Sequence, residues 1–328
     1  MRAMAIDRFG GPEVLHLAEL ALPAPGPGEV LIKVAYAGVN PADWKCREGW
    51  LAQFFRYRFP FVLGFDAAGV VVKLGAGVSG CAVGDRVVAC SKQGQGEWGS
   101  YAEYVVAAID GVGHLPARLP LADAAALPTA GVTAWEGLFE SGRVVAGQKV
   151  LIHGGAGGVG SYAIQLARHA GAAVAATCGP RNLDYVRGLG AELAIDYRAG
   201  RIAEELSAWA PQGVDLVLDA VGQGSLPQAV ELVKPGGIIA PIATLIADEA
   251  PHDALRAQQR GVRIVPTMSS YERSGAQLRQ LVALCGAGAV RAPALTVLPL
   301  EQAAEAQCLL QAGHVRGKIV LEVAGERT

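Results

Sequence analysis

A glycine-rich turn is the part of this 328-residue chain whose residue types and spacing best fit a chemical role. Gly155, Gly157 and Gly160 follow an apolar run at 150–152 and precede a stretch at 161–168 with helical spacing. In G-x-G-x-x-G, the first glycine permits a tight turn, the second lets the backbone approach a pyrophosphate, and the third lets helix and strand pack closely. The pattern alone is weak in a chain with 43 glycines, so the surrounding elements decide its meaning.

Apolar strands alternate with helical stretches downstream of the turn. The expected strands cover 172–177, 193–195, 214–220, 237–240 and 262–265, and the expected helices cover 183–189, 202–210 and 226–233. Short, nearly continuous apolar strands that alternate with helices predict a doubly wound parallel sheet buried on both faces. In this context the glycine turn indicates a Rossmann domain, with the pyrophosphate of a dinucleotide at the start of a helix.

The end of the second expected strand indicates which dinucleotide is bound. NAD-binding folds place an acidic side chain there, on the ribose 2′-hydroxyl. This chain has no carboxylate at that end; the small Thr177 leaves room for a 2′-phosphate, and the guanidinium of Arg181 can pair with it. NADPH is therefore favoured over NADH. The alternative reading of Arg181 is a solvated loop charge.

Composition and charge exclude several classes of function. Hydrophobic residues make up 52% of the chain, which leaves material for two cores, and the formal net charge is -2. A near-neutral chain without a basic stripe argues against nucleic acid or an anionic membrane surface as partner. No apolar run has the length of a spanning helix and the start lacks a signal-peptide pattern, so a cytoplasmic protein is expected.

The six cysteines are scattered and form no C-x-x-C pair. Cysteines in that arrangement, in a reducing compartment, are most often small core residues. A structural zinc lobe is therefore not expected.

The chain is expected to divide at 122 and 267. Residues 1–122 show short alternating apolar segments typical of a β-rich domain, and 123–267 form the dinucleotide-binding domain. The closing strands expected at 294–298 and 318–323 have no crossover helix after them. We therefore expect 268–328 to return to the first domain and complete it.

Several motifs occur in the order seen in one known family. They are the segments 38–43, 63–71, 83–87, 99–104 and 126–134, followed by the glycine turn. In this the chain resembles the medium-chain dehydrogenase/reductases, and within them the zinc-independent quinone oxidoreductase branch, the zeta-crystallin-like enzymes. The resemblance implies a GroES-like catalytic domain split around a Rossmann domain. It also implies NADPH as cofactor and the reduction of quinones or α,β-unsaturated carbonyls.

The positions that hold catalytic zinc in other members of the family are changed here. Asn40 stands where zinc-dependent relatives carry a cysteine, and Phe65-Asp66 stands where they carry His-Glu. Catalytic zinc requires three protein ligands. No metal is therefore expected, and alcohol oxidation through a zinc alkoxide is excluded.

An electrophilic substrate can accept a hydride without a metal. Hydrogen bonds are sufficient to stabilise the negative charge that develops on it. The catalytic candidates are Asn40, Asp43, Lys45 and Thr133; the resemblance implies that Asn40 and Thr133 lie near the nicotinamide and that Asp43 fixes the loop, while Lys45 departs from the family pattern. Many quinone reductases have tyrosine where this chain has Lys45, whose ammonium could stabilise an enolate and donate a proton in a desolvated site. The alternative reading of Lys45 is a solvated charge beside Arg47.

Further cofactor contacts carry over from the resemblance. The expected set is Thr129, Gly155, Gly157, Gly158, Val159, Gly160, Thr177, Arg181, Tyr197, Val221, Gly222 and Lys318. For Tyr197 the alternative is a half-buried edge aromatic. Relatives often form homodimers through the edge strand of the nucleotide sheet, here expected at 262–265.

An aromatic segment follows the Asn40 motif. It contains Trp50, Phe54, Phe55, Tyr57 and Phe59, which could form a wall for a flat hydrophobic substrate or simply the core of the domain. The resemblance implies a carbonyl or quinone as substrate, and the aromatic segment is consistent with a small hydrophobic one. The alternative function is a cofactor-binding protein of the same fold without catalysis, in a binding or regulatory role.

Overall fold

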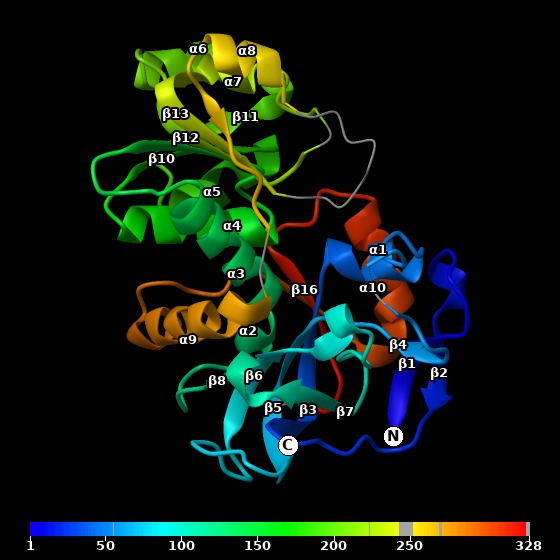
Figure 1. Ribbon diagram of the computed structural model, residues 1–328. Coiled ribbons are helices and arrows are strands. Elements are labelled where there is room, and N and C mark those ends of the chain that lie inside the picture. Colours follow the sequence, from blue (N-terminus) through cyan, green and yellow to red (C-terminus); the bar gives the residue numbers. More distant parts are fainter. Residues whose placement is uncertain (55, 223, 243–251, 269–270, 326–328) are drawn as a thin grey trace. The chain divides into compact units, whose positions relative to one another are not determined.

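The computed structural model describes residues 1–54, 56–222, 224–242, 252–268 and 271–325. It contains two compact units, Met1–Val132 with Ser270–Thr328 and Thr133–Ser269 (Figure 1). The domain boundaries expected at 122 and 267 differ from these divisions and stay predictions.

The first unit is built around two sheets. A small antiparallel sheet has the order β2-β1-β4, and a seven-stranded sheet has the order β15-β16-β3-β5-β6-β8 with β7 paired to β3. The strands are β1 Arg2–Ile6, β2 His16–Glu19, β3 Glu29–Val39, β4 Phe61–Val62, β5 Asp66–Leu74, β6 Arg86–Cys90, β7 Tyr104–Ala108, β8 Val112–His114, β15 Leu295–Pro299 and β16 Lys318–Glu322.

The closing strands of the chain lie in the sheet of this first unit. β16 pairs antiparallel with β3, placing Ile319 opposite Val39, and β15 pairs parallel with β16. Figure 1 shows β16, in red, beside β3, in blue. Because β16 enters the sheet at Lys318, residues from the two ends of the sequence meet at that end of β3.

The helices of the first unit lie between and after these strands. They are α1 Pro41–Arg47, α2 Leu121–Ala125, α3 Pro128–Trp135, which crosses into the second unit, α9 Tyr271–Ala287 and α10 Ala303–Gln311, with the 3₁₀ turns η1 Pro12–Val14, η2 Lys92–Gln95, η3 Ile109–Gly111 and η7 Leu300–Gln302. The core contains apolar side chains from both sheets and from α10, including Ile32, Phe61 and Ala303.

The second unit is a parallel sheet with the order β11-β10-β9-β12-β13-β14. The strands are β9 Lys149–His153, β10 Ala173–Cys178, β11 Leu193–Asp196, β12 Val214–Asp219, β13 Val233–Pro241 and β14 Arg263–Ile264. Numbered within the unit this is the order 3-2-1-4-5-6 of a dinucleotide-binding fold, whose switch point lies between its first and fourth strands. Together with the GroES-like first unit, it confirms the expected fold class.

The helices of the second unit connect these strands. They are α4 Gly158–His169, α5 Leu183–Leu189, α6 Ile202–Trp209, α7 Ala229–Leu232 and α8 Ala254–Gln259, with the π-helical turn η4 Glu136–Ser141 and the 3₁₀ turns η5 Pro180–Asn182 and η6 Tyr197–Ala199. Buried aliphatic side chains such as Leu151, Leu206 and Val233 pack helices and sheet together.

The helix expected at 226–233 is shorter in the structure. Pro227 lacks a backbone N–H and disfavours helical geometry at the residue before it, so the helix is confined to Ala229–Leu232. Val233 already pairs with Val214 in the sheet. The strand expected at 237–240 begins earlier, at Val233, and contains an irregularity where the register with β12 shifts and Gly236 has a φ of +84°.

Candidate active site and cofactor site

The glycine turn lies at the carboxyl end of β9, beside the switch point of the sheet. A Cβ on Gly160 would lie 2.3 Å from the carbonyl oxygen of Gly154, and one on Gly155 would lie 2.8 Å from the Cβ of Ala176. A Cβ on Gly157 would have its nearest neighbour, Gly154 O, at 3.6 Å. The first and third glycines are thus required by packing, while the second leaves open space over the turn, where a pyrophosphate fits.

α4 begins directly after this turn, with Gly157 as its N-cap residue. Gly158 and Val159 form the first helical positions, so their N–H groups are among those that an α-helix leaves without intrahelical partners. A helix start that follows a glycine turn of this shape binds phosphate groups. This geometry fits a pyrophosphate, and the contact of these residues with NADPH stays a prediction.

Thr177 is fully buried beneath the turn. Its Oγ1 accepts a hydrogen bond from the N–H of Gly154 at 3.1 Å and lies 2.7 Å from Nδ1 of His153. The hydroxyl therefore holds the turn against β10. The contact with a 2′-phosphate expected for Thr177 stays a prediction.

Two polar side chains at this edge are absent from the predicted set. His153 ends β9, is buried, and has Nε2 3.0 Å from Oγ of Ser225; burial lowers the pKa of its imidazole. Asp219 ends β12 and accepts hydrogen bonds from the N–H groups of Val221 and Gly222 at 3.0 and 2.9 Å. The sequence signal for His153 and Asp219 is the same: each is a polar residue at the end of an apolar strand.

Arg181 and Tyr197 lie after neighbouring strands. Arg181 is exposed in η5, directly after β10, and Tyr197 begins η6, directly after β11. The Tyr197 ring lies near the position of a Cβ on Gly179, at 3.8 Å, and 36% of the residue is exposed. Both residues border the sheet edge where the adenosine end is expected, and their contacts with it stay predictions.

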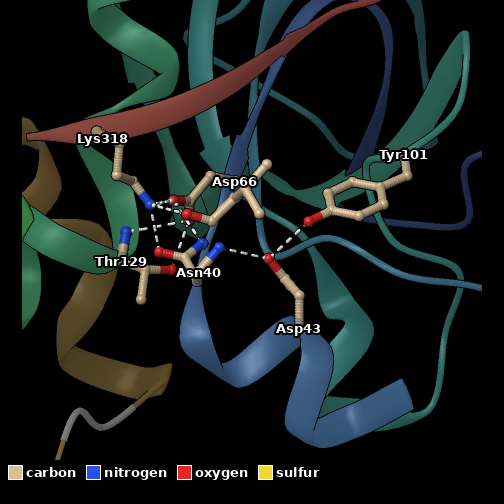
Figure 2. A network of polar contacts seen from close by, with 7 residues as sticks. Asn40, Asp43, Asp66, Tyr101, Thr129 and Lys318 are labelled. Atoms are coloured by element: carbon tan, nitrogen blue, oxygen red, sulfur yellow. Dashed lines mark hydrogen bonds and ion pairs between the residues drawn. The ribbon is translucent and has the colours of Figure 1, made fainter. Parts of the chain in front are cut away.

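A buried polar network forms the candidate active site of the first unit. Asn40 donates from Nδ2 to Oδ2 of Asp66 at 2.9 Å, and its Oδ1 accepts from the ammonium of Lys318 (Figure 2). The same ammonium donates to the carbonyl of Val39 at 2.9 Å and lies 3.3 Å from Oδ2 of Asp66. All three N–H donors of Lys318 therefore have acceptors inside the network.

The network continues through two carboxylates. Thr129 donates to Oδ1 of Asp66 from its backbone N–H at 3.0 Å and from Oγ1 at 2.5 Å. Asp43 accepts from the N–H of Asn40 at 2.7 Å and from the hydroxyl of Tyr101 at 2.9 Å. Burial raises the pKa of Asp43 to about 7, against the opposing effect of these hydrogen bonds.

Local sequence explains how Asn40 is placed. It is the N-cap of α1, with Pro41 at the first helical position, and Asp43 at the third position closes a capping box. The Asn40 backbone is therefore fixed by α1, while its side chain is fixed by β5 and β16 through Asp66 and Lys318. Asp66 and Tyr101 were missed as site residues, although both lie in motifs that carry the resemblance.

Lys45 lies on α1, five residues after Asn40. It is only 7% exposed, and Arg47 is fully buried, so the reading of Lys45 as a solvated charge is wrong. Its ammonium lies 5.6 Å from the ring centroid of Trp44. The ammonium that contacts Asn40 belongs to Lys318, for which a direct cofactor contact had been expected.

Most of the aromatic segment packs on aromatic neighbours. Tyr57 and Phe59 make edge contacts with Phe9 at centroid distances of 5.0 and 5.2 Å, and Trp50 contacts Trp44 at 4.9 Å. Phe54 is 62% exposed, and Phe55 lies outside the described residues. Tyr57 thus packs against the core, and Trp50 and Phe59 are also partly exposed, at 38% and 41%. A contact of this segment with a substrate stays a prediction.

Thr133 is buried in α3 and is the first residue of the second unit. Val221 and Gly222 follow β12, held there by Asp219, and Gly222 has a φ of +74°. The structure thus brings Asn40, Asp43, Thr129 and Lys318 together in the first unit. The glycine turn, Thr177 and Val221 lie together in the second.

Comparison with known proteins matches both parts of the chain. Residues 26–117 match the alcohol dehydrogenase GroES-like domain, and residues 189–321 match a family described as zinc-binding dehydrogenase. The chain is 34% identical to the chloroplastic quinone-oxidoreductase QR1 of Triphysaria versicolor over 98% of each chain. It is 35% identical to the chloroplastic NADPH-dependent alkenal/one oxidoreductase of Arabidopsis thaliana, over 98% of this chain and 79% of the relative.

Solved structures agree with these relatives. The quinone oxidoreductase from Coxiella burnetii matches with a TM-score of 0.87 and 34% identity. The match covers 98% of this chain and 99% of the Coxiella chain. A mycobacterial protein solved in complex with NADPH matches with a TM-score of 0.86 and 29% identity. The match covers 98% of this chain and 100% of the mycobacterial chain.

A GroES-like domain interrupted by a Rossmann domain defines a medium-chain dehydrogenase/reductase. Within that superfamily, the chain belongs to the zinc-independent quinone oxidoreductase branch. The name of the matched family refers to zinc, but Asn40 and Phe65 replace the cysteine and histidine that the resemblance gives as zinc ligands. An amide and a phenyl ring do not supply the thiolate and imidazole of such a site.

Proposed function

We propose that this protein is an NADPH-dependent oxidoreductase that reduces quinones or α,β-unsaturated carbonyl compounds. The observation that carries this proposal is the buried network around Asn40, Asp66 and Lys318, in which Asn40 stands where the resemblance gives zinc-dependent relatives a cysteine ligand. NADPH supplies the hydride when it is bound at the glycine turn. The relatives named as quinone and alkenal/one oxidoreductases support this substrate class.

Asn40 is the residue we propose to contact the oxygen of the substrate. One N–H of its Nδ2 binds Asp66, and Lys318 fixes the amide orientation by donating to Oδ1. The second N–H of Nδ2 can then donate to an oxygen on which negative charge develops during reduction. A donor held in place before the reaction needs no reorganisation, which is the basis of this kind of stabilisation.

The remaining candidates keep the roles predicted from the sequence. Asp43 orients Asn40 through its backbone N–H, and Lys45 and Thr133 stay catalytic candidates. Lys318 is a positioning residue in this proposal, because its three donors already have acceptors. The cofactor residues are those of the glycine turn, with Thr177, Arg181, Tyr197, Val221 and Gly222 along the same sheet edge.

The discriminating experiment is an NADPH oxidation assay with a panel of quinones and conjugated enones. We expect turnover with members of this panel and none with saturated ketones or simple alcohols. Tight NADPH binding without turnover on any acceptor would instead support the non-catalytic, cofactor-binding alternative. Turnover that a chelator abolishes in the wild type would contradict metal-independent catalysis.

The Asn40→Ala and Asn40→Asp variants refine the test. The alanine variant removes the donor, and we expect kcat to fall by about 100-fold with little change in NADPH affinity. The aspartate variant keeps the shape but places a negative charge where charge develops, so we expect an equal or larger loss. Unchanged kcat in both would remove Asn40 from the proposed mechanism.

Among the described residues, no helix combines the length and apolarity needed to cross a bilayer. We propose a cytoplasmic homodimer; the plant relatives are named as chloroplastic proteins.

A further inference from the structure

A second group of chemically reactive side chains lies away from the Asn40 network, on the turn between β5 and β6 and at the end of β8. Cys81, Asp85 and His114 each offer one ligand atom, and these three atoms lie within 4.8 Å of one another. Nδ1 of His114 lies 3.4 Å from Oδ2 of Asp85. Cys81 is partly buried and His114 is exposed, so the group faces solvent on one side.

Backbone hydrogen bonds and strand pairing position these three residues. Oδ2 of Asp85 accepts from the N–H of Ala82 at 2.8 Å, which closes the turn that carries Cys81. β6 pairs with β8 so that Val87, two residues after Asp85, lies opposite His114. Two neighbouring strands thus bring a thiol, a carboxylate and an imidazole to one point.

The combination of ligand types indicates which cations would bind. Thiolate and imidazole with one carboxylate suit Zn²⁺ and similar borderline divalent ions, whereas Mg²⁺ and Ca²⁺ prefer oxygen ligands alone. The thiol is close enough to Asp85 that burial, the carboxylate charge and a hydrogen bond together raise the pKa of Cys81. A divalent cation would replace the thiol proton there and offset the negative charge of Asp85.

We propose that Cys81, Asp85 and His114 form a surface site for a zinc-class divalent cation, with water as the fourth ligand. Binding forms bonds from the cation to Sγ, to a carboxylate oxygen and to Nδ1, and releases the Cys81 proton to solvent. The cation would join the β5–β6 turn to β8. This site uses none of the residues proposed for catalysis, so the proposal does not rest on the proposed function.

The chain offers matched controls for each ligand. His16 and Asp7 form a second histidine–aspartate pair at 3.4 Å with similar histidine exposure, so His16→Gln tests whether an ion pair of this kind suffices for binding. Cys308 is an exposed free cysteine, so Cys308→Ser tests for non-specific thiol binding.

The experiment is titration of the metal-free full chain with Co²⁺ and, in parallel, with Zn²⁺ by calorimetry. For the wild type, His16→Gln and Cys308→Ser, we expect one Co²⁺ per chain, with the thiolate-to-cobalt absorption band and tetrahedral d–d bands. Cys81→Ser should abolish the charge-transfer band, and His114→Gln should weaken binding by at least about tenfold. Zinc should raise the melting temperature of the wild type but not of Cys81→Ser.

The proposal fails if the absorption band is absent or if it survives in Cys81→Ser. It also fails if Cys308→Ser weakens binding as much as Cys81→Ser does. NADPH oxidation by Cys81→Ser keeps this result separate from the proposed function, since turnover should be the same as in the wild type.

Discussion

The buried ion pair between Asp66 and Lys318 determines how the Asn40 side chain is held. Asp66 is 0% exposed and receives donors from Asn40, Thr129 and Lys318. Buried charges are stable only when paired and hydrogen-bonded, so removing one partner leaves the other uncompensated. The stability and the orientation of Asn40 are therefore linked through the same contacts.

Replacing Lys318 with methionine should destabilise the protein strongly. The Asp66 carboxylate would lose its counter-charge in a buried site, which is expected to lower the free energy of unfolding by about 3–5 kcal/mol. Arg187→Met is the control, because its partner Asp184 is fully exposed and solvent screening leaves such a surface pair little effect on stability. Chemical denaturation measures both; equal stability of the two variants would contradict the buried pair.

Arg181→Ala should distinguish the two nicotinamide cofactors. A guanidinium paired with the 2′-phosphate makes a charge-assisted contact worth about 1.5–3 kcal/mol, so we expect roughly 10- to 100-fold weaker NADPH binding. NADH lacks this phosphate, and its affinity should change less than about twofold. Fluorescence titration with both cofactors measures the effect, with Arg187→Ala as the exposed-arginine control. An equal loss for both cofactors would refute the assignment.

At the scale of elements, two glycines of the glycine turn have different roles: Gly160 is required by packing, and Gly157 leaves space for the pyrophosphate. A Cβ on Gly160 meets backbone at 2.3 Å, whereas a Cβ on Gly157 meets nothing closer than 3.6 Å. Gly157 also has ordinary backbone angles, with φ -79° and ψ 177°, which alanine adopts without strain. Two alanine substitutions three residues apart should therefore have different effects.

Gly157→Ala should leave stability within about 0.5 kcal/mol of wild type and still weaken NADPH binding by about tenfold or more, because the methyl group fills the pyrophosphate space. Gly160→Ala should instead destabilise the second unit by about 1–3 kcal/mol through overpacking of α4 on the turn. Thermal unfolding combined with NADPH titration checks both. Normal NADPH affinity in a folded Gly157→Ala variant would place the pyrophosphate elsewhere.

The start of α1 should give the protein a distinctive pH dependence. Asp43 has a pKa of about 7 in the folded state against 3.8 for the ordinary group, so folding favours its protonated form between these values. The free energy of unfolding should therefore fall as the pH rises through this range, by on the order of 1 kcal/mol per pH unit. Asp43→Asn, whose amide oxygen can still accept from Asn40 and Tyr101, should lose this slope.

Denaturation curves between about pH 5 and 8 provide the test, as the difference between wild type and Asp43→Asn. Asp184→Asn serves as the control, since its carboxylate is fully exposed. A wild-type slope equal to that of Asp43→Asn would mean that the Asp43 carboxyl is already ionised throughout this range.

Local patterns predicted most of the elements because each pattern reports on its own segment. The helix at 183–189 has the expected bounds, and the strand expected at 193–195 is one residue longer in the structure. The helix expected at 226–233 failed because Pro227 and the pairing of Val233 outweighed its helical spacing. Apolar periodicity alone does not report a competing sheet partner.

At the scale of the whole molecule, the candidate active site depends on contacts that no local pattern encodes. Lys318 and Asp66 are 252 residues apart and meet because β16 pairs with β3 beside β5. The sequence motifs identified Asn40 and Asp43, but the partner of Asn40 could be found only from that pairing. For the same reason the sequence predicts a catalytic role for Lys45 and a cofactor contact for Lys318, but not the contact of Lys318 with Asn40.

The edge strand β14 of the second unit is where we expect two copies of the chain to pair. β14 ends the parallel sheet and pairs only with β13 among the described strands. The N–H of Val265 donates to Ile239, so the alternation of a strand directs the N–H of Ile264 away from β13, toward the edge. An edge with available donors and acceptors pairs readily with another strand.

We therefore expect a homodimer in solution, with about twice the 33.8 kDa mass of the chain in light scattering after size-exclusion chromatography. Ile264→Pro removes the outward donor but leaves the bond from Val265 to β13, and should shift the protein to monomers. Arg260→Ala, which alters a charge near the same strand without removing an edge donor, should stay dimeric. A wild-type protein that is monomeric at micromolar concentration would refute this interface, because β14 would then not pair with the same strand of a second copy.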